Sequence, residues 1–141
     1  MVESVLGGML AALAYGAVGT VLMALGYVLV DLATPGRLRD LIWVHRNRNA
    51  AMLLCSGLLG VGLIAATAIL VSEDGLVAGL LSSFGYGVAG LLLMAVSFVL
   101  LDLATPGKLG ELLVDPEVHP AAWVSASVHL AISGIIAAAI S

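Results

Sequence analysis

The chain alternates four long, uncharged apolar runs with short polar segments. A bilayer core is crossed by about 20 apolar residues at 1.5 Å each, and every run reaches that length. In lipid each backbone N–H and C=O must be paired within its own segment, so we expect helices, and the period-2 pattern of membrane strands is absent. The runs are Ser4–Val30, Ala50–Val71, Gly75–Leu101 and Ala121–Ser141. The pattern predicts an all-α integral membrane protein with four transmembrane helices.

One hexapeptide, Asp-Leu-Ala-Thr-Pro-Gly, ends both the first and the third apolar run. It occupies Asp31–Gly36 and Asp102–Gly107, and a gapless shift of 71 residues also aligns Tyr15 with Tyr86. We therefore expect two tandem helical-hairpin repeats of the same orientation, because each contains two spans. Their predicted bounds are residues 1–71 and 72–141.

Composition narrows the class of protein further. Hydrophobic residues make up 62% of the chain and charged residues 10%, whereas a soluble domain usually carries about 25% charged residues. The net charge of −4 and the lack of a basic stripe argue against nucleic acid as a partner. The expected surroundings are a lipid bilayer.

The charges sort by side of the membrane. All Lys and Arg residues follow the first and third runs, whereas the opposite side carries Glu3, Glu73 and Asp74. The positive-inside rule places both hexapeptide loops in the cytoplasm and both termini outside. The first loop is basic and would favour anionic lipid head groups, with a merely solvated face as the alternative. The basic residues are Arg37, Arg39, Arg46, Arg48 and Lys108.

Each hexapeptide predicts an elbow from a spanning helix to a short interfacial one. Proline disfavours helix for the residue before it and suits a first helical position, and threonine is a good N-cap. We expect an elbow helix over Pro35–His45 capped by Thr34, and a second over Pro106–Val114 capped by Thr105.

Two interpretations are open for Asp31 and Asp102, which stand where the spans end. The carboxylates could accept hydrogen bonds from the bare N–H groups of the elbow helices. Alternatively, two symmetric carboxylates at the inner mouth of the bundle could bind a cation or relay a proton.

Three further polar side chains lie deep in the spans. Tyr15 and Tyr86 could bond across the bundle or line a polar path, since a buried phenol needs a partner. His129 falls near mid-membrane, where a histidine suggests protonation or ligand binding. A hydrogen bond to a backbone carbonyl or to a serine such as Ser125 would also satisfy it.

Small residues recur at every fourth position of the first run and, with one exception, of the third. Such ladders let membrane helices approach closely, so we expect these runs at the centre, crossing each other or a neighbouring subunit of a homo-oligomer. Gly8, Gly16, Gly79 and Gly87 are the predicted packing glycines. The ladders are Gly8, Ala12, Gly16, Thr20, Ala24 and Gly79, Ser83, Gly87, Leu91, Ala95.

Recognisable catalytic chemistry is missing from the sequence. It holds no nucleophile-and-base set, no phosphate-binding glycine loop and no His/Cys spacing for a metal, so we expect neither an enzyme nor a cofactor.

The doubled elbow in a four-helix chain resembles the YjfL-like bacterial inner-membrane proteins, the family of domain of unknown function 350. The resemblance covers essentially the whole chain and implies a location in the bacterial inner membrane, and it brings no established activity. It is carried by Asp31, Thr34, Pro35, Gly36, Leu38 and by Asp102, Thr105, Pro106, Gly107, Leu109.

Two functional hypotheses follow. In the first, the chain is a non-enzymatic oligomeric module or scaffold whose elbows anchor it or dock a peripheral cytoplasmic protein. In the second, an oligomeric channel or transporter passes a cation, proton or small amine, with Asp31 and Asp102 at its mouth and Tyr15, Tyr86 and His129 deeper.

Overall fold

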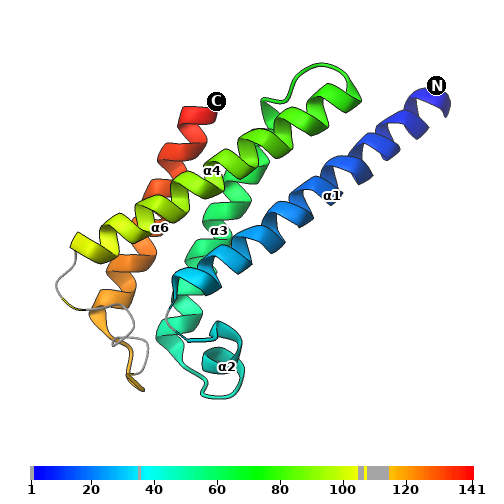
Figure 1. Ribbon diagram of the computed structural model, residues 1–141. Coiled ribbons are helices and arrows are strands. Elements are labelled where there is room, and N and C mark those ends of the chain that lie inside the picture. The colour runs from blue at the N-terminus through cyan, green and yellow to red at the C-terminus, as the bar shows by residue number, and fades with distance from the viewer. Residues whose placement is uncertain (1, 35, 105–106, 108–114) are drawn as a thin grey trace.

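The computed structural model describes residues 2–34, 36–104, 107 and 115–141, which fold into five helices without strands (Figure 1). Four of the five are long and apolar enough to cross a membrane, which confirms the predicted all-α architecture and its four spans. The helices are α1 (Val2–Ala33), α2 (Leu38–Trp43), α3 (Arg48–Leu70), α4 (Leu76–Ala104) and α6 (Pro120–Ile140).

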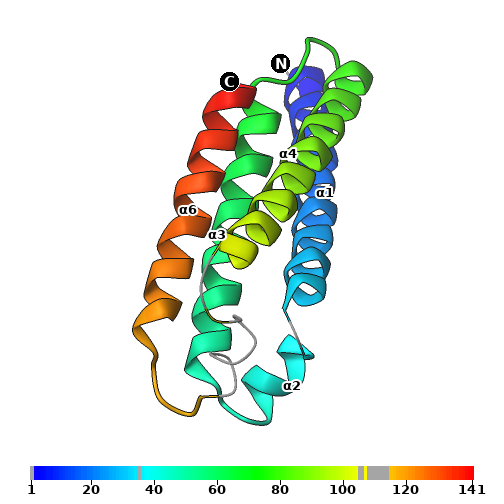
Figure 2. The same ribbon diagram turned by 60° about the vertical axis from the view of Figure 1, so that its left-hand side comes forward.

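The long helix α3 lies at the centre of the chain. It packs against α1, α2, α4 and α6, and half of its most apolar stretch is buried, against 17% for α1. Both termini lie at one end of the bundle and α2 at the other (Figure 2). The sequence predicted the first and third runs, α1 and α4, at the centre, whereas within one chain that place belongs to α3.

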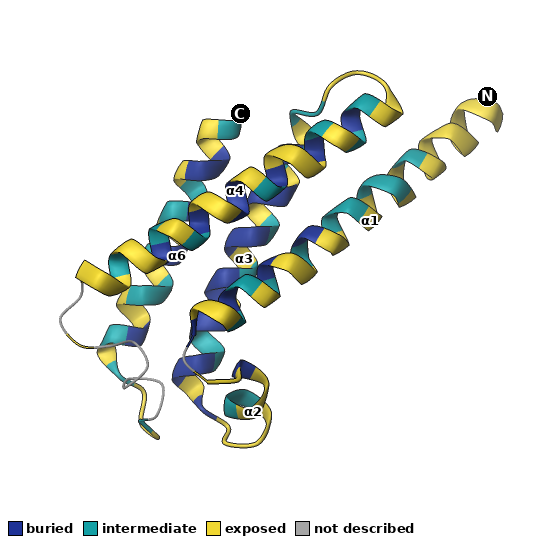
Figure 3. Ribbon diagram, viewed as in Figure 1, coloured by how far each residue is buried: buried dark blue, intermediate teal, exposed yellow. Residues whose placement is uncertain are grey.

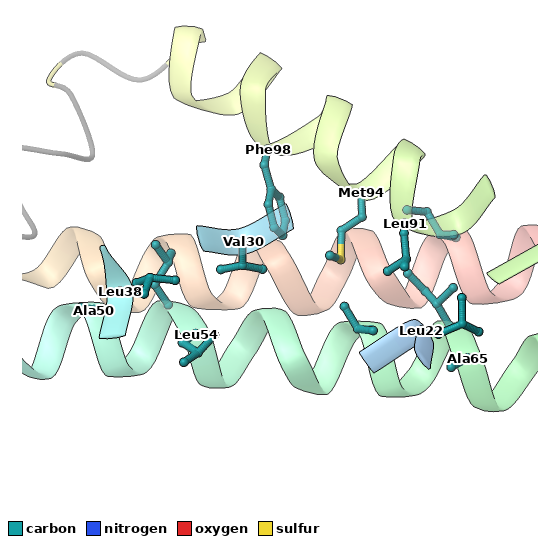
Figure 4. Close-up of a cluster of buried hydrophobic side chains, with 13 residues drawn as sticks. Leu22, Val30, Leu38, Ala50, Leu54, Ala65, Leu91, Met94 and Phe98 are labelled. Atoms are coloured by element: carbon teal, nitrogen blue, oxygen red, sulfur yellow. The ribbon is translucent and has the colours of Figure 1, made fainter. Parts of the chain in front are cut away.

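Glycines bring α3 close to its neighbours. A Cβ added at Gly26 of α1 would lie 2.5 Å from Val61 Cγ2, and one added at Gly57 of α3 would lie 2.9 Å from Val30 Cγ2. Neither position has room for a methyl group, so at each point a valine side chain of one helix lies directly against the backbone of the other. This contact places the core between α1, α3 and α4, where Leu22, Ile64 and Met94 are fully buried (Figure 4).

The first elbow helix is shorter than predicted. It covers Leu38–Trp43 rather than Pro35–His45, and Gly36 before it has φ 101°, a left-handed conformation that cannot belong to a helix. The chain must therefore turn before the helix can begin. The second predicted elbow helix, Pro106–Val114, and its cap Thr105 lie outside the described residues, Gly107 apart.

Large apolar side chains cover the outside of the bundle. The amino-terminal half of α1 is exposed along most of its length (Figure 3), and residues such as Leu13 and Leu70 are 70% and 84% exposed. A surface of this kind suits lipid, whose tails are as apolar as these side chains.

Candidate functional site

The first elbow is held by the side chain of Asp31. Its Oδ1 accepts a hydrogen bond from the backbone N–H of Leu38 at 2.8 Å, across seven residues of sequence. Leu38 is itself fully buried, and α2 packs on α3, so a hydrogen bond to α1 and apolar packing on α3 together fix the start of α2. This geometry matches the capping interpretation of Asp31, and the cation-binding interpretation stays a prediction.

Thr34 does not cap α2, contrary to the predicted elbow. Its hydroxyl donates to the carbonyl of Val30 at 2.8 Å, and the N-cap of α2 is Arg37, which makes no side-chain capping bond. The hydroxyl thus satisfies a carbonyl at the end of α1, where intrahelical donors run out. Asp102 lies in the last turn of α4, at the position equivalent to Asp31.

A groove opens beside the first elbow. It has a volume of about 680 Å³ and is lined by one residue of α1 and five of the elbow. Two guanidinium groups, one carboxylate and two aromatic rings contribute to its wall. The lining residues are Tyr27, Arg37, Arg39, Asp40, Trp43 and Val44.

A buried asparagine, which the sequence analysis did not single out, joins the two halves at the same end. Asn49 Nδ2 donates to the carbonyl of Glu117 at 2.9 Å, and its Oδ1 accepts from the N–H of His119 at 3.1 Å. Asn47 caps α3 by accepting from Ala50 N, and His119 caps α6. These side chains bind the loop before α6 to the start of α3.

His129 lies inside the bundle, between α3, α4 and α6. Its ring stacks on Phe98 with centroids 3.6 Å apart, and its Nδ1 lies 3.3 Å from Ser56 Oγ. The Ser56 hydroxyl also lies within hydrogen-bonding distance of the carbonyl of Leu53, at 2.9 Å. The partner is Ser56 rather than the suggested Ser125.

The two matched tyrosines lie in different surroundings. The hydroxyl of Tyr15 of α1 lies directly over Gly79 of α4, and 3.3 Å from Ser72 Oγ in the turn before α4. Tyr86 of α4 is 46% exposed on the outside. Together with His129 in the interior, these side chains do not share one surface, and the polar path stays a prediction.

The two glycine ladders also differ. Gly79 and Gly87 of α4 are buried against α1, whereas Gly8 and Gly16 of α1 are exposed and an added Cβ would meet nothing within 4 Å. Among the residues described, no three His, Cys, Asp or Glu side chains gather as metal ligands would.

Comparison with known proteins places the whole chain in one family. The family model described as Domain of Unknown Function (DUF350) matches residues 4–140. The chain is 35% identical to a UPF0719 transmembrane protein of Mycolicibacterium paratuberculosis over 137 residues, covering 97% of this chain and 91% of that protein. It is 36% identical to one of Mycobacterium bovis, over 97% of this chain and 90% of the relative. No solved structure matches the chain.

Proposed function

The chain belongs to the DUF350 family, a multi-pass membrane family of unknown function, and from that premise we propose that it is a non-enzymatic module that acts as a homo-oligomer. The observation that carries the proposal is the contact between α1 and α4, which joins two unlike helix faces. We further propose that its basic end faces the cytoplasm of a bacterial inner membrane, where the elbows anchor it or dock a peripheral protein.

Within the chain, side chains of α1 fill spaces above glycines of α4. Tyr15 lies over Gly79, and Leu22 lies over Gly87, where an added Cβ would come within 2.8 Å of Leu22 Cδ2. Leu22 is fully buried by this contact. We call Tyr15 and Leu22 of α1 the knobs of this contact, and Gly79 and Gly87 of α4 its sockets.

The 71-residue repeat predicts a second copy of this contact that the chain does not make. The equivalent knobs are Tyr86 and Leu93 of α4, which are 46% and 55% exposed. The equivalent sockets are Gly8 and Gly16 of α1, which an added Cβ would leave without a neighbour within 4 Å. The sockets on α4 are therefore filled by side chains of the same chain, whereas the equivalent sockets on α1 are open.

The open contact would join α4 of one copy to α1 of another, so it pairs unlike positions. A contact between unlike faces repeats from copy to copy and closes into a ring when the rotation allows. We therefore propose that Tyr86 and Leu93 of one copy pack onto Gly8 and Gly16 of the next, so that α1 and α4 alternate around the assembly. Small-residue contacts of this kind drive helix association where no hydrophobic force acts between helices.

The outer face of α4 has the shape such packing needs. Tyr86 borders a shallow groove of about 650 Å³ whose other walls include the small residues Ala78, Ser82, Gly85 and Ala89. A neighbouring helix can approach closely along this line of small side chains.

The substitution Gly16→Leu tests the proposal. Since nothing lies near Gly16 within the chain, the single chain keeps its fold, and the added side chain blocks only a neighbouring copy. We expect light scattering of the detergent-solubilised protein to give a multiple of the 14.3 kDa chain mass for the wild type and the single-chain mass for the variant. Gly134→Leu in α6, which also meets nothing within 4 Å, is the matched control and keeps the wild-type mass.

A cross-linking experiment tests whether the proposed residues of α1 and α4 face each other between copies. Two tagged chains of different length, both carrying Cys55→Ser, are co-expressed, one with Gly16→Cys and the other with Leu93→Cys. Oxidation yields a disulfide-linked heterodimer if these residues face each other between copies, whereas Gly7→Cys in place of Gly16→Cys gives much less. A single-chain mass for the wild type, or equal cross-linking from both positions, refutes the proposal.

The conduit hypothesis gains no comparable support from the described residues. It can be tested directly with the double variant Asp31→Asn and Asp102→Asn. If the two carboxylates form a site, this variant should lose flux and still assemble.

A further inference from the structure

We propose that the groove beside the first elbow binds the head group of an anionic phospholipid carrying a single phosphodiester and free hydroxyls, of the phosphatidylglycerol type. The groove lies at the basic end of the bundle, between the last turns of α1 and the short helix α2. The inference does not depend on oligomer formation, since all the lining residues belong to one chain.

The charge of the groove matches this ligand. Arg37 and Arg39 contribute two positive charges and Asp40 one negative charge, which leaves a net charge of +1 against −1 for a phosphodiester. Within the described part of the chain, no hydrogen bond or ion pair engages either guanidinium. Arginine matches phosphate oxygens with paired N–H donors, and the Asp40 carboxylate can accept from hydroxyls of the head group.

The aromatic and apolar residues place the groove at the membrane surface. Trp43 and Val44 are 67% and 71% exposed beside it, and indole rings prefer the head-group level of a bilayer. On α1, Val28 and Leu32 are 50% and 77% exposed, so the helix beside the groove presents apolar side chains to the acyl chains of a bilayer. A phosphate held by the arginines would thus leave its lipid tails in the hydrocarbon.

The walls of the groove are fixed before any ligand arrives. Leu38, the first residue of α2, is fully buried, and the Asp31 carboxylate accepts a hydrogen bond from its N–H. Arg37 is the N-cap of α2 and Arg39 lies in its first turn, and this part of the helix is hydrogen-bonded to the end of α1. Binding therefore requires little further ordering of the backbone that carries the two arginines.

The sequence of the second repeat differs from the first at several of these positions. At the positions equivalent to Tyr27, Arg39 and Trp43 the sequence has Phe98, Gly110 and Val114. Phe98 is buried, and its ring stacks on that of His129. Lys108 and Glu111 stand at the positions of Arg37 and Asp40, so the second arginine, the tyrosine hydroxyl and the indole are what distinguish the first repeat.

Native mass spectrometry of the purified protein tests the proposal. Dioleoyl phosphatidylglycerol is titrated against dioleoyl phosphatidylcholine, and the lipid retained per chain gives the apparent affinity. We expect the wild type to prefer phosphatidylglycerol, and Arg37→Gln with Arg39→Gln to weaken that binding by roughly tenfold or more. Arg46→Gln with Arg48→Gln removes the same charge from the same loop outside the groove and should leave the affinity within about twofold.

Further arms distinguish a lipid site from diffuse attraction of charge and from a site for soluble phosphate. Trp43→Val, the residue of the second repeat, should weaken binding without any change of charge. An equal loss in both arginine pairs would mean diffuse attraction, and equal retention of the two lipids would mean no site; either result overturns the proposal. So would displacement of the lipid by excess glycerol 3-phosphate, which would make a soluble phosphate the ligand. A thermal melt of each variant confirms that it is folded.

Discussion

At the scale of single residues, short polar side chains complete the backbone hydrogen bonding where the spans end. The last carbonyls of a helix and the first N–H groups of the next lack intrahelical partners. Thr34 supplies a donor to the Val30 carbonyl, and Asp31 supplies an acceptor to the Leu38 N–H. The repeated hexapeptide therefore has a structural use in the first elbow whatever else the carboxylate does.

Replacing Asp31 measures that use. Asp31→Ala removes the acceptor of the Leu38 N–H and should destabilise the protein by about 0.5–2 kcal/mol, the range found for lost helix caps. Asp31→Asn keeps an oxygen acceptor and should lose less than half as much. Thermal unfolding in detergent gives both values, with the exposed Asp40→Ala as control. If Asp31→Asn proves as damaging as Asp31→Ala, the charge rather than the hydrogen bond is what matters.

His129 gives a second prediction at this scale. Leucine stands at the equivalent position of the first repeat, Leu58, and Ser56 keeps its bond to the Leu53 carbonyl without the histidine. His129→Leu should therefore fold with a loss below about 1.5 kcal/mol, whereas His129→Ala leaves a cavity beside Phe98 and should cost about 2–4 kcal/mol. Chemical denaturation in mixed micelles compares them. Failure of His129→Leu to fold would show that the imidazole is needed for more than filling space.

At the scale of elements, glycine decides which helices meet. The contact of α1 with α3 depends on Gly26 facing Val61 and on Gly57 facing Val30. Small residues also occur at the same spacing on the outer side of α1, where the chain itself places nothing. A row of small residues therefore indicates that another helix can pack closely against that face. Which helix does so depends on the rest of the fold.

Adding one methyl group at a close contact should be costly. Gly26→Ala forces a Cβ to within 2.5 Å of Val61 Cγ2, so the helices must separate, and overpacking of this kind costs about 1–3 kcal/mol. Gly134→Ala adds the same atom where nothing lies within 4 Å and should be neutral or slightly stabilising, since alanine favours helix. The difference in melting temperature between the two variants tests the packing of α1 on α3 directly.

The four membrane spans could be predicted from the sequence, whereas the hydrogen bonds between distant segments could not. Lipid imposes a length and an absence of charge on each segment, and both are local properties of the sequence. Asn49 was missed because its partners, Glu117 and His119, are 68 and 70 residues away and its repeat equivalent is Pro120. No local pattern marks an asparagine that will be buried between a helix start and a distant loop. The start of the elbow helix was misplaced for a local reason, since Gly36 adopts a left-handed conformation that helix capping preferences do not reveal.

At the scale of the whole molecule, the fold gathers the arginines at one end. The turn that contains Glu73 joins α3 to α4 at the end where both termini lie, and α2 with its arginines lies at the other end (Figure 2). Loops that carry Lys and Arg are preferentially kept on the cytoplasmic side, so we expect the end with the arginines to face the cytoplasm.

Labelling of single cysteines in intact bacterial cells tests this orientation. In a Cys55→Ser background, which removes the chain's one cysteine, we expect a membrane-impermeant maleimide to modify Glu73→Cys from outside and to modify Arg46→Cys only after the membrane is permeabilised. Both side chains are exposed at opposite ends of the bundle, so differences in labelling report the side of the membrane and not burial. Labelling of Arg46→Cys alone would invert the orientation and place the lipid groove in the outer leaflet. Modification of both from one side would contradict the pair of spanning hairpins on which the oligomer and the groove rest.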